Sequence, residues 1–392
     1  MMRYQLKVTR TVKVSLFLLA IMVSCLVLQQ FFLRNVDHNS LRIEGFYQEE
    51  TDSLDVVFIG ASDIYTSFMP GRAYEQYGFT SYLLASESIT SEGIKTAVKE
   101  TVRTQHPGMI VVEANAFLYG NSDNDVNEAH VHKFFDNLPL SENKIEYINK
   151  NVPVNQRWEY FFPLIKYHGL WTEYPERLHM IASNLTLDAR GFNYLKGFRT
   201  TAYIHSPDKP CLNDKLALET GELDLDPKLE KQPNDLLDYC DEQHINLMFV
   251  RAPHYVTQET YNRVKRSNKM ASIVNSRGYS YYTLENDVKR IGIDEKHDFY
   301  NVDHMNVYGA IKFTDYLSEK ILYKEELKVD PLSDEQKENW SEVVTATNQL
   351  YRYCDDIMTT NTNKKKGAQE DVWTLLQLGD YSGAPIQRTD QP

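Results

Sequence analysis

The sequence is poor in cysteine, and its cysteines are widely spaced. Only four occur in 392 residues, none in a C-x-x-C pair: Cys25, Cys211, Cys240 and Cys354. The spacing argues against a cysteine-based zinc site. Because Cys25 lies in an apolar segment, the body has three cysteines and can form one disulfide at most. The fold therefore does not depend on a disulfide framework.

The chain also lacks the basic surplus that nucleic-acid binding requires. Its formal net charge is −13, and four basic residues at the start contribute +4, so the remainder carries −17. We therefore expect no nucleic-acid partner. The sequence contains no internal repeat either.

Residues 14–33 form an uncharged apolar run, VSLFLLAIMVSCLVLQQFFL. This length spans a bilayer as a helix. The basic residues precede the run, so the positive-inside rule predicts a cytoplasmic tail at 1–13, an anchor at 14–33 and an extracytoplasmic remainder. A cleaved signal peptide and a lipoprotein signal at Cys25 are the alternatives. No small-x-small site ends the run, and Leu-Val-Leu after Cys25 disfavours lipidation.

The polar, acidic segment 34–53 is interpreted as a short stalk. From residue 54, short apolar runs alternate with segments of helical period, which predicts an α/β domain with a parallel sheet. We expect strands at 56–59, 79–85, 109–113, 245–250 and 279–282. We expect helices at 91–105, 227–243, 259–276 and 307–322.

Residues 117–226 interrupt this pattern and are too long for one loop. We interpret them as an insertion with helices at 141–151 and 174–183. Its dense aromatics favour core packing over a sugar-binding surface or a lid. Arg157 and His168 are candidates for polymer contact. Residues 331–392 are expected to form an amphipathic helix at 334–358 and then a flexible tail.

A serine follows the first buried strand. Gly60 is expected to let the backbone turn sharply, which places Ser62 at the carboxyl edge where open α/β sheets bind ligands. Its hydroxyl would lie near backbone N–H groups able to hold an oxyanion. The alternative is that Ser62 or Asp63 merely caps the next helix.

A histidine in the segment DFYNVDHMN, residues 298–306, supplies a candidate base. A serine hydroxyl needs an imidazole to take its proton, and the imidazole needs a partner on its other nitrogen. His304 is that imidazole, and the position three residues earlier is Asn301, with Asp298 and Asp303 close by. The alternative is that His304 caps the last helix.

Together these motifs resemble the SGNH (GDSL-type) hydrolase superfamily, and more narrowly its membrane-anchored bacterial branch. That branch includes the D-alanine transfer protein of teichoic acids and periplasmic acetyltransferases of exopolysaccharides. FIGASDIY at 58–65, with Pro70 following, is similar to the block that holds the nucleophile. DFYNVDHMNVYGA at 298–310 is similar to the block that holds the base. The resemblance covers residues 55–322.

The resemblance implies a flavodoxin-like three-layer sandwich at 54–330, with Ser62 as nucleophile, His304 as base and no cofactor. The family's aspartate is replaced by Asn301 here. In a serine protease triad this change lowers turnover by about 10⁴-fold, partly by favouring the wrong tautomer. Asp298 or Asp303 would then substitute, or the enzyme would work as a dyad.

The oxyanion-hole blocks also depart from the family pattern. A turn at Ser86 stands where a glycine is expected, and Asn115 is a candidate donor. Arg251 and His254, at the carboxyl edge of their strand, are candidate binding residues. His130 and His132 have ligand-like spacing on an expected strand, but no third ligand is evident, so we interpret them as a surface pair and expect no metal.

We therefore predict an extracytoplasmic serine acyltransferase or esterase that modifies a cell-envelope glycopolymer at a bacterial cell membrane. By resemblance, a membrane-bound O-acyltransferase would be its partner. The rival prediction is a degenerate SGNH-like scaffold that binds the polymer or that partner without chemistry. A plain hydrolase is the third.

Overall fold

A five-stranded parallel sheet forms the centre of the protein in the computed structural model, which describes residues 2–32, 38–119, 128–166 and 194–360. The strand order is β2-β1-β3-β4-β5, and every pairing is parallel. The strands are β1 (Val56–Gly60), β2 (Ser81–Ala85), β3 (Met109–Glu113), β4 (Leu247–Arg251) and β5 (Ser280–Thr283). The predicted parallel α/β sheet is confirmed.

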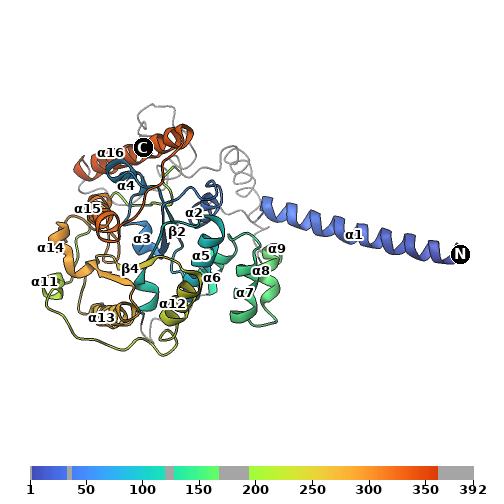
Figure 1. Ribbon diagram of the computed structural model, residues 1–392, viewed down its shortest axis with the longest axis horizontal. Helices are drawn as coiled ribbons and strands as arrows, with labels where there is room; N and C mark the ends of the chain where they lie inside the picture. Colours follow the sequence, from blue (N-terminus) through green and yellow to red (C-terminus); the bar gives the residue numbers. More distant parts are fainter. Residues whose placement is uncertain (1, 33–37, 120–127, 167–193, 361–392) are drawn as a thin grey trace.

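Helices cover both faces of the sheet (Figure 1). Side chains alternate along each strand, so Val57 and Ile59 enter one core while Val56 and Phe58 enter the other. The first core includes residues of α5 (Ser91–Thr104), α12 (Gln232–Gln243) and α13 (Tyr261–Ser276). The second includes residues of α4 (Pro70–Tyr77), α14 (Val288–Ile291), α15 (Val307–Glu319), the π-helical turn η4 (Lys320–Lys324) and α16 (Asp334–Thr360).

Part of the segment expected to be a stalk packs against the sheet. Residues 38–46 form α2 (His38–Phe46), and Ile43 and Phe46 are fully buried in the first core. Arg42 is also buried, where its Nε donates to the carbonyl of Gly197 at 2.7 Å. The expected spacer therefore contains a helix anchored in the body.

The aromatic insertion contributes to the core where the structure describes it. Its helices are α6 (Glu128–Phe135), α7 (Glu142–Asn151), α8 (Arg157–Phe161), α9 (Pro163–Lys166) and α11 (Asn213–Leu216). The helix predicted at 141–151 is confirmed, with Ser141 as its N-cap. Phe134, Phe135, Tyr147 and Tyr160 join the first core, as the core-packing interpretation expects. The helix predicted at 174–183 and His168 lie outside the described residues.

The predicted C-terminal amphipathic helix is confirmed as α16, and it belongs to the packed body. Trp340 packs against Tyr74 of α4 in a tilted arrangement with ring centroids 4.8 Å apart. Gly71 of α4 approaches α16 so closely that a Cβ there would lie 2.1 Å from Thr347 Oγ1. Any larger residue at position 71 would therefore push α4 and α16 apart.

The N-terminal segment forms α1 (Met2–Phe32), a single helix that extends away from the body (Figure 1). Its side chains are described from residue 9 to residue 25, and its large apolar side chains from Val12 to Val23 are exposed. Across the described part of the chain, no helix is both long enough and apolar enough to cross a membrane.

Candidate active site

Polar side chains gather where the five strands end. Parallel strands deliver their carboxyl ends to one edge, so residues far apart in the sequence meet there. This edge carries most of the residues that the sequence singled out: Ser62 and Asp63 after β1, Ser86 after β2, Asn115 after β3, and Arg251 and His254 at the end of β4.

Ser62 is the first residue of α3 (Ser62–Tyr65), directly after the turn that ends β1. The N-cap position is Ala61, and no side chain caps this helix. Ser62 is half-buried, and its Oγ makes no hydrogen bond with any residue that the structure describes. The helix-capping interpretation of Ser62 is therefore excluded, and its hydroxyl remains available.

Gly60 serves close packing rather than an unusual backbone conformation. It ends β1, and it is not among the glycines with positive φ. A Cβ at this position would lie 2.8 Å from the Cβ of Glu113 and 3.1 Å from a methyl carbon of Ile64. Glycine therefore lets β1 and the start of α3 approach β3. The prediction of a sharp turn at Gly60 itself was wrong.

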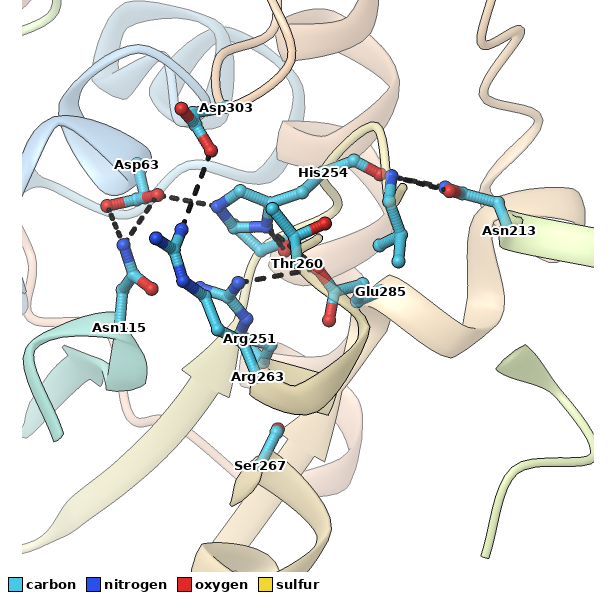
Figure 2. Close-up of polar contacts among 12 residues, drawn as sticks. Asp63, Asn115, Asn213, Arg251, His254, Thr260, Arg263, Ser267, Glu285 and Asp303 are labelled. Carbon is cyan, nitrogen blue, oxygen red and sulfur yellow. Dashed lines mark hydrogen bonds and ion pairs between the residues drawn. The ribbon is translucent and has the colours of Figure 1, made fainter. Parts of the chain in front are cut away.

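Asp63 does not cap a helix either, because it is the centre of a buried polar network (Figure 2). Its carboxylate accepts hydrogen bonds from Asn115 Nδ2 at 3.0 and 3.1 Å and from His254 Nε2 at 2.5 Å. Burial opposes ionisation, but the bond and charge of His254 and the charge of Arg251 outweigh it and hold the pKa of Asp63 below its usual range. Asp63 is therefore a buried anion at the carboxyl edge of the sheet.

His254 is held between acceptors on both ring nitrogens. Nε2 faces Asp63, while Nδ1 lies 2.6 Å from the carbonyl oxygen of Ala252 and 3.1 Å from Glu285 Oε1. Since carbonyl and carboxylate oxygens only accept, both nitrogens must carry protons. Burial and Arg251 favour the neutral ring, but the bonds to Asp63 and Glu285 prevail and raise the pKa of His254 to about 9. His254 is an imidazolium, not a base.

Arg251 completes the network with two carboxylates that the sequence analysis missed. Its guanidinium lies 3.3 Å from Glu113 Oε1 and 3.4 Å from Glu285 Oε1, and its side chain is 2% exposed. Burial and the charge of Asp63 raise the pKa of Glu113 to about 7. Arg251 and His254, the candidate binding residues, both contact Glu285 within this network. Glu113 could have been identified from the sequence, because a charged residue at the end of the apolar run MIVVE is expected to need a buried partner.

His304 has the geometry of a base with a fixed tautomer. Its Nδ1 lies 3.0 Å from Asn301 Oδ1, and the backbone N–H of Asp303 donates to that same oxygen at 2.9 Å. The backbone donor requires that the amide present its oxygen, so Nδ1 of His304 must be the donor and Nε2 must carry the lone pair. Desolvation lowers the pKa of His304 despite the nearby charge of Asp63, which keeps the ring neutral.

Neither neighbouring aspartate takes the place of Asn301. Asp298 is fully buried and accepts from Lys312 Nζ at 2.6 Å and from the backbone N–H of Asp294 at 2.7 Å. Asp303 is partly exposed and forms an ion pair with Arg263 at 3.7 Å (Figure 2). Among the described residues, the hydrogen-bond partner of His304 Nδ1 is Asn301 alone.

His304 does not cap the helix that follows it. Asn306 is the N-cap of α15, where its Oδ1 accepts from the backbone N–H of Tyr308 at 3.0 Å and of Gly309 at 3.4 Å. The helix-capping interpretation of His304 is therefore excluded as well.

Asp63, which follows Ser62 in the chain, interacts electrostatically with His304. The charge of Asp63 opposes the desolvation that lowers the pKa of His304, and His304 in turn helps to lower the pKa of Asp63. The backbone N–H of Tyr255 also donates to the carbonyl of Val302 at 2.9 Å, which ties the loop after β4 to the His304 loop. This bond joins the two loops that follow β4 and precede α15.

The two predicted oxyanion donors are already engaged. The backbone N–H of Ser86 donates to the carbonyl of Gly60 at 3.2 Å, and Asn115 Nδ2 is bound to Asp63. Ser86 Oγ and Asn115 Oδ1 are buried and have no hydrogen-bond partner among the described residues. In the turn after β2, the hydroxyl of Ser86 is therefore available to donate a hydrogen bond.

The histidine pair in the insertion lies on a helix, so the predicted strand there was wrong. His130 and His132 belong to α6, and His132 is 2% exposed. The surface-pair interpretation was therefore wrong for His132. Arg157, a candidate for polymer contact, donates to the backbone carbonyls of Val152 at 2.9 Å and Asn149 at 2.7 Å.

Comparisons with known proteins return no matching protein family, no similar curated protein and no similar solved structure.

Proposed function

We propose that the protein is a serine acyltransferase or esterase of the SGNH type, acting outside the cytoplasm on a cell-envelope glycopolymer. The observation that carries the proposal is the bond from His304 to Asn301. An asparagine next to a catalytic histidine normally allows the wrong tautomer. Here the Asp303 N–H orients the amide, which leaves Nε2 of His304 unprotonated.

The arrangement of the sheet edge supports the same proposal. The hydroxyl of Ser62 has no hydrogen-bond partner among the described residues, and His304 shares the electrostatic environment of the adjacent Asp63. A neutral imidazole is the form that accepts a proton. The negative charge of Asp63 would stabilise the imidazolium formed during reaction, a task that Asn301 cannot perform.

The reaction would proceed in two steps. Ser62 Oγ attacks the acyl carbonyl of an ester donor while its proton passes to His304 Nε2. The bond to the donor's alcohol oxygen breaks, and that oxygen takes the proton from His304. A hydroxyl of the glycopolymer then gives its proton to His304 and attacks the acyl-serine. The ester bond to Ser62 Oγ breaks, and that oxygen takes the proton from His304, which restores both residues. Water in place of the polymer gives hydrolysis.

The engaged oxyanion donors favour a second candidate, a scaffold that binds the polymer or a membrane-bound O-acyltransferase without chemistry. Neither the Ser86 N–H nor the Asn115 amide is free to hold an oxyanion. In the catalytic proposal, the Ser62 backbone N–H and the Ser86 hydroxyl would take over this role.

The membrane anchor at 14–33 is part of the proposal. Exposed apolar side chains from Val12 to Val23 of α1 motivate it, since a long exposed apolar surface marks an interaction with a membrane or another protein. Alkaline extraction of membranes from cells expressing the full chain tests it. Retention in the pellet would support the anchor, and release into the supernatant would overturn it.

The chemistry is tested by labelling the full chain, in its native membranes, with a fluorophosphonate probe and locating the adduct by peptide mass spectrometry. We expect an adduct on Ser62 that is absent from Ser62→Ala. Ser53→Ala is the matched control. Ser53 is also half-buried, but its hydroxyl donates to the carbonyl of Glu50, away from the sheet edge.

An adduct on Ser62 that persists in Ser53→Ala supports an activated serine. A chain that stays unlabelled at Ser62 overturns the catalytic proposal and favours the scaffold.

A further inference from the structure

A second cluster of chemical groups lies in the insertion, where α6 meets α8. Ligand atoms of Glu128, His132 and Glu159 all lie within 4.8 Å of one another. Glu128 and His132 are four residues apart on α6 and therefore project from one face of that helix. Glu159 comes from α8, which α6 contacts through a stacked pair, His132 on Tyr160, with ring centroids 4.1 Å apart.

The hydrogen bonds of His132 leave one ring nitrogen able to bind a metal ion. Its Nδ1 lies 2.9 and 3.0 Å from the two carboxylate oxygens of Asp136, so Nδ1 is the donor. Nε2 is buried, has no hydrogen-bond partner among the described residues and points toward Glu128, whose Oε1 lies 3.7 Å away. A carboxylate that fixes one imidazole nitrogen while the other stays open is the arrangement found around metal-binding histidines.

The two glutamates already converge on a positive charge. Lys166 Nζ lies 3.4 Å from Glu128 Oε1 and 3.4 Å from Glu159 Oε2. These distances exceed those of good charge-assisted hydrogen bonds. The ammonium of Lys166 therefore offsets the negative charge of the carboxylates but forms only long hydrogen bonds with them. It does not donate to the lone pair on His132 Nε2. A metal ion would satisfy all three ligand atoms at once.

We propose that Glu128, His132 and Glu159 bind a divalent transition-metal ion of the zinc class. Imidazole with carboxylates suits Zn²⁺. Ligand atoms about 2.0–2.1 Å from a tetrahedral ion stand roughly 3.3 Å apart, close to the 3.7 Å between His132 Nε2 and Glu128 Oε1. The ion would fasten α6 to α8 and displace Lys166 toward solvent. The proposal is independent of the chemistry at Ser62.

The test is Zn²⁺ affinity of the full chain, measured by competition with a chromophoric chelator, together with the visible absorption of bound Co²⁺. We expect one bound ion and a tetrahedral Co²⁺ spectrum. His132→Phe keeps an aromatic ring on Tyr160 and is expected to abolish binding. Asp136→Asn is expected to weaken it by about 10- to 100-fold.

Two further variants separate metal binding from general electrostatics. His130→Gln removes the neighbouring imidazole and should leave the affinity unchanged. Lys166→Gln removes the competing cation and should tighten Zn²⁺ binding by about two- to tenfold, the range expected for two partly exposed ion pairs.

His132→Phe could lose metal binding because α6 misfolds. Glu159→Gln removes a ligand on α8 instead, so it tests the site without changing α6. Loss of binding in both variants supports the site. Zn²⁺ binding that is absent from the unmodified chain, or that survives both changes, overturns it.

Discussion

The loops that carry His254 and His304 hold the same side chain near the same carboxylate, yet in opposite states. His254 is packed between Asp63 and Glu285 and is charged, with its pKa raised to about 9. His304 lies against the amide of Asn301, and desolvation lowers its pKa. The contrast shows that desolvation favours the neutral ring in both histidines, and that only direct carboxylate partners, present at His254, overcome it. A carboxylate near each nitrogen holds His254 as a cation, whereas an oriented amide on Nδ1 leaves Nε2 of His304 with a free lone pair.

Removing each imidazole would separate the two roles most clearly. His304→Ala is expected to slow fluorophosphonate labelling of Ser62 by about 10²–10⁴-fold, the usual contribution of a general base. Its free energy of unfolding should change little, because His304 has a single hydrogen-bond partner on its ring among the described residues. Time-resolved labelling and denaturant unfolding measure the two quantities. A labelling rate equal to that of the unmodified chain would contradict this role.

His254→Ala should give the opposite pattern. It leaves Asp63 and Glu285 buried without their cation, and breaking such a pair costs about 3–5 kcal/mol of unfolding free energy. Denaturant unfolding of the full chain in mild detergent measures this loss. His244→Ala is a matched control, since His244 is an exposed residue at the end of α12. Equal stability of the two variants would show that His254 is not a structural cation.

The pH dependence of stability is expected to follow His254. Its folded-state pKa of about 9 lies above the ordinary value of 6.5, so folding is favoured by proton binding. The contribution, about 3 kcal/mol, is fully present below pH 6.5 and is lost as the pH rises through 9. Unfolding midpoints between pH 6 and 10 test this, and His254→Ala should remove the decline. A decline that persists in the variant would assign it to other groups.

Asn301→Asp should raise the pKa of His304 and so make its ring more like the charged ring of His254. The pKa of His304 is lowered here, so labelling of Ser62 should stay fast down to a midpoint below pH 6.5. A carboxylate at 301 favours the imidazolium and should raise that midpoint by about one pH unit or more. Labelling rates from pH 4 to 8 give both midpoints. An unchanged midpoint would mean that Asn301 does not set the basicity of His304.

The sequence by itself determined the sheet and the positions of its edge residues. Runs such as MIVVE and INLMFV are mostly apolar on both faces, which a sheet covered by helices can bury. The ends of β2, β4 and β5 differ from the predicted bounds by one or two residues. Ser62 and His304 were identifiable because each stands at the end of a regular element. The partner of His304 was also local in sequence, since Asn301 lies three residues away.

Only the tertiary structure decided the partners that come from distant segments. Asp63 and His254 are 191 residues apart, and no pattern in either segment indicates that one neutralises the other. The same holds for Arg251 with Glu113, and for His132 with Glu159 in the insertion. A side chain's protonation state depends on donors and acceptors within a few ångströms. Packing, not sequence separation, determines which groups lie that close.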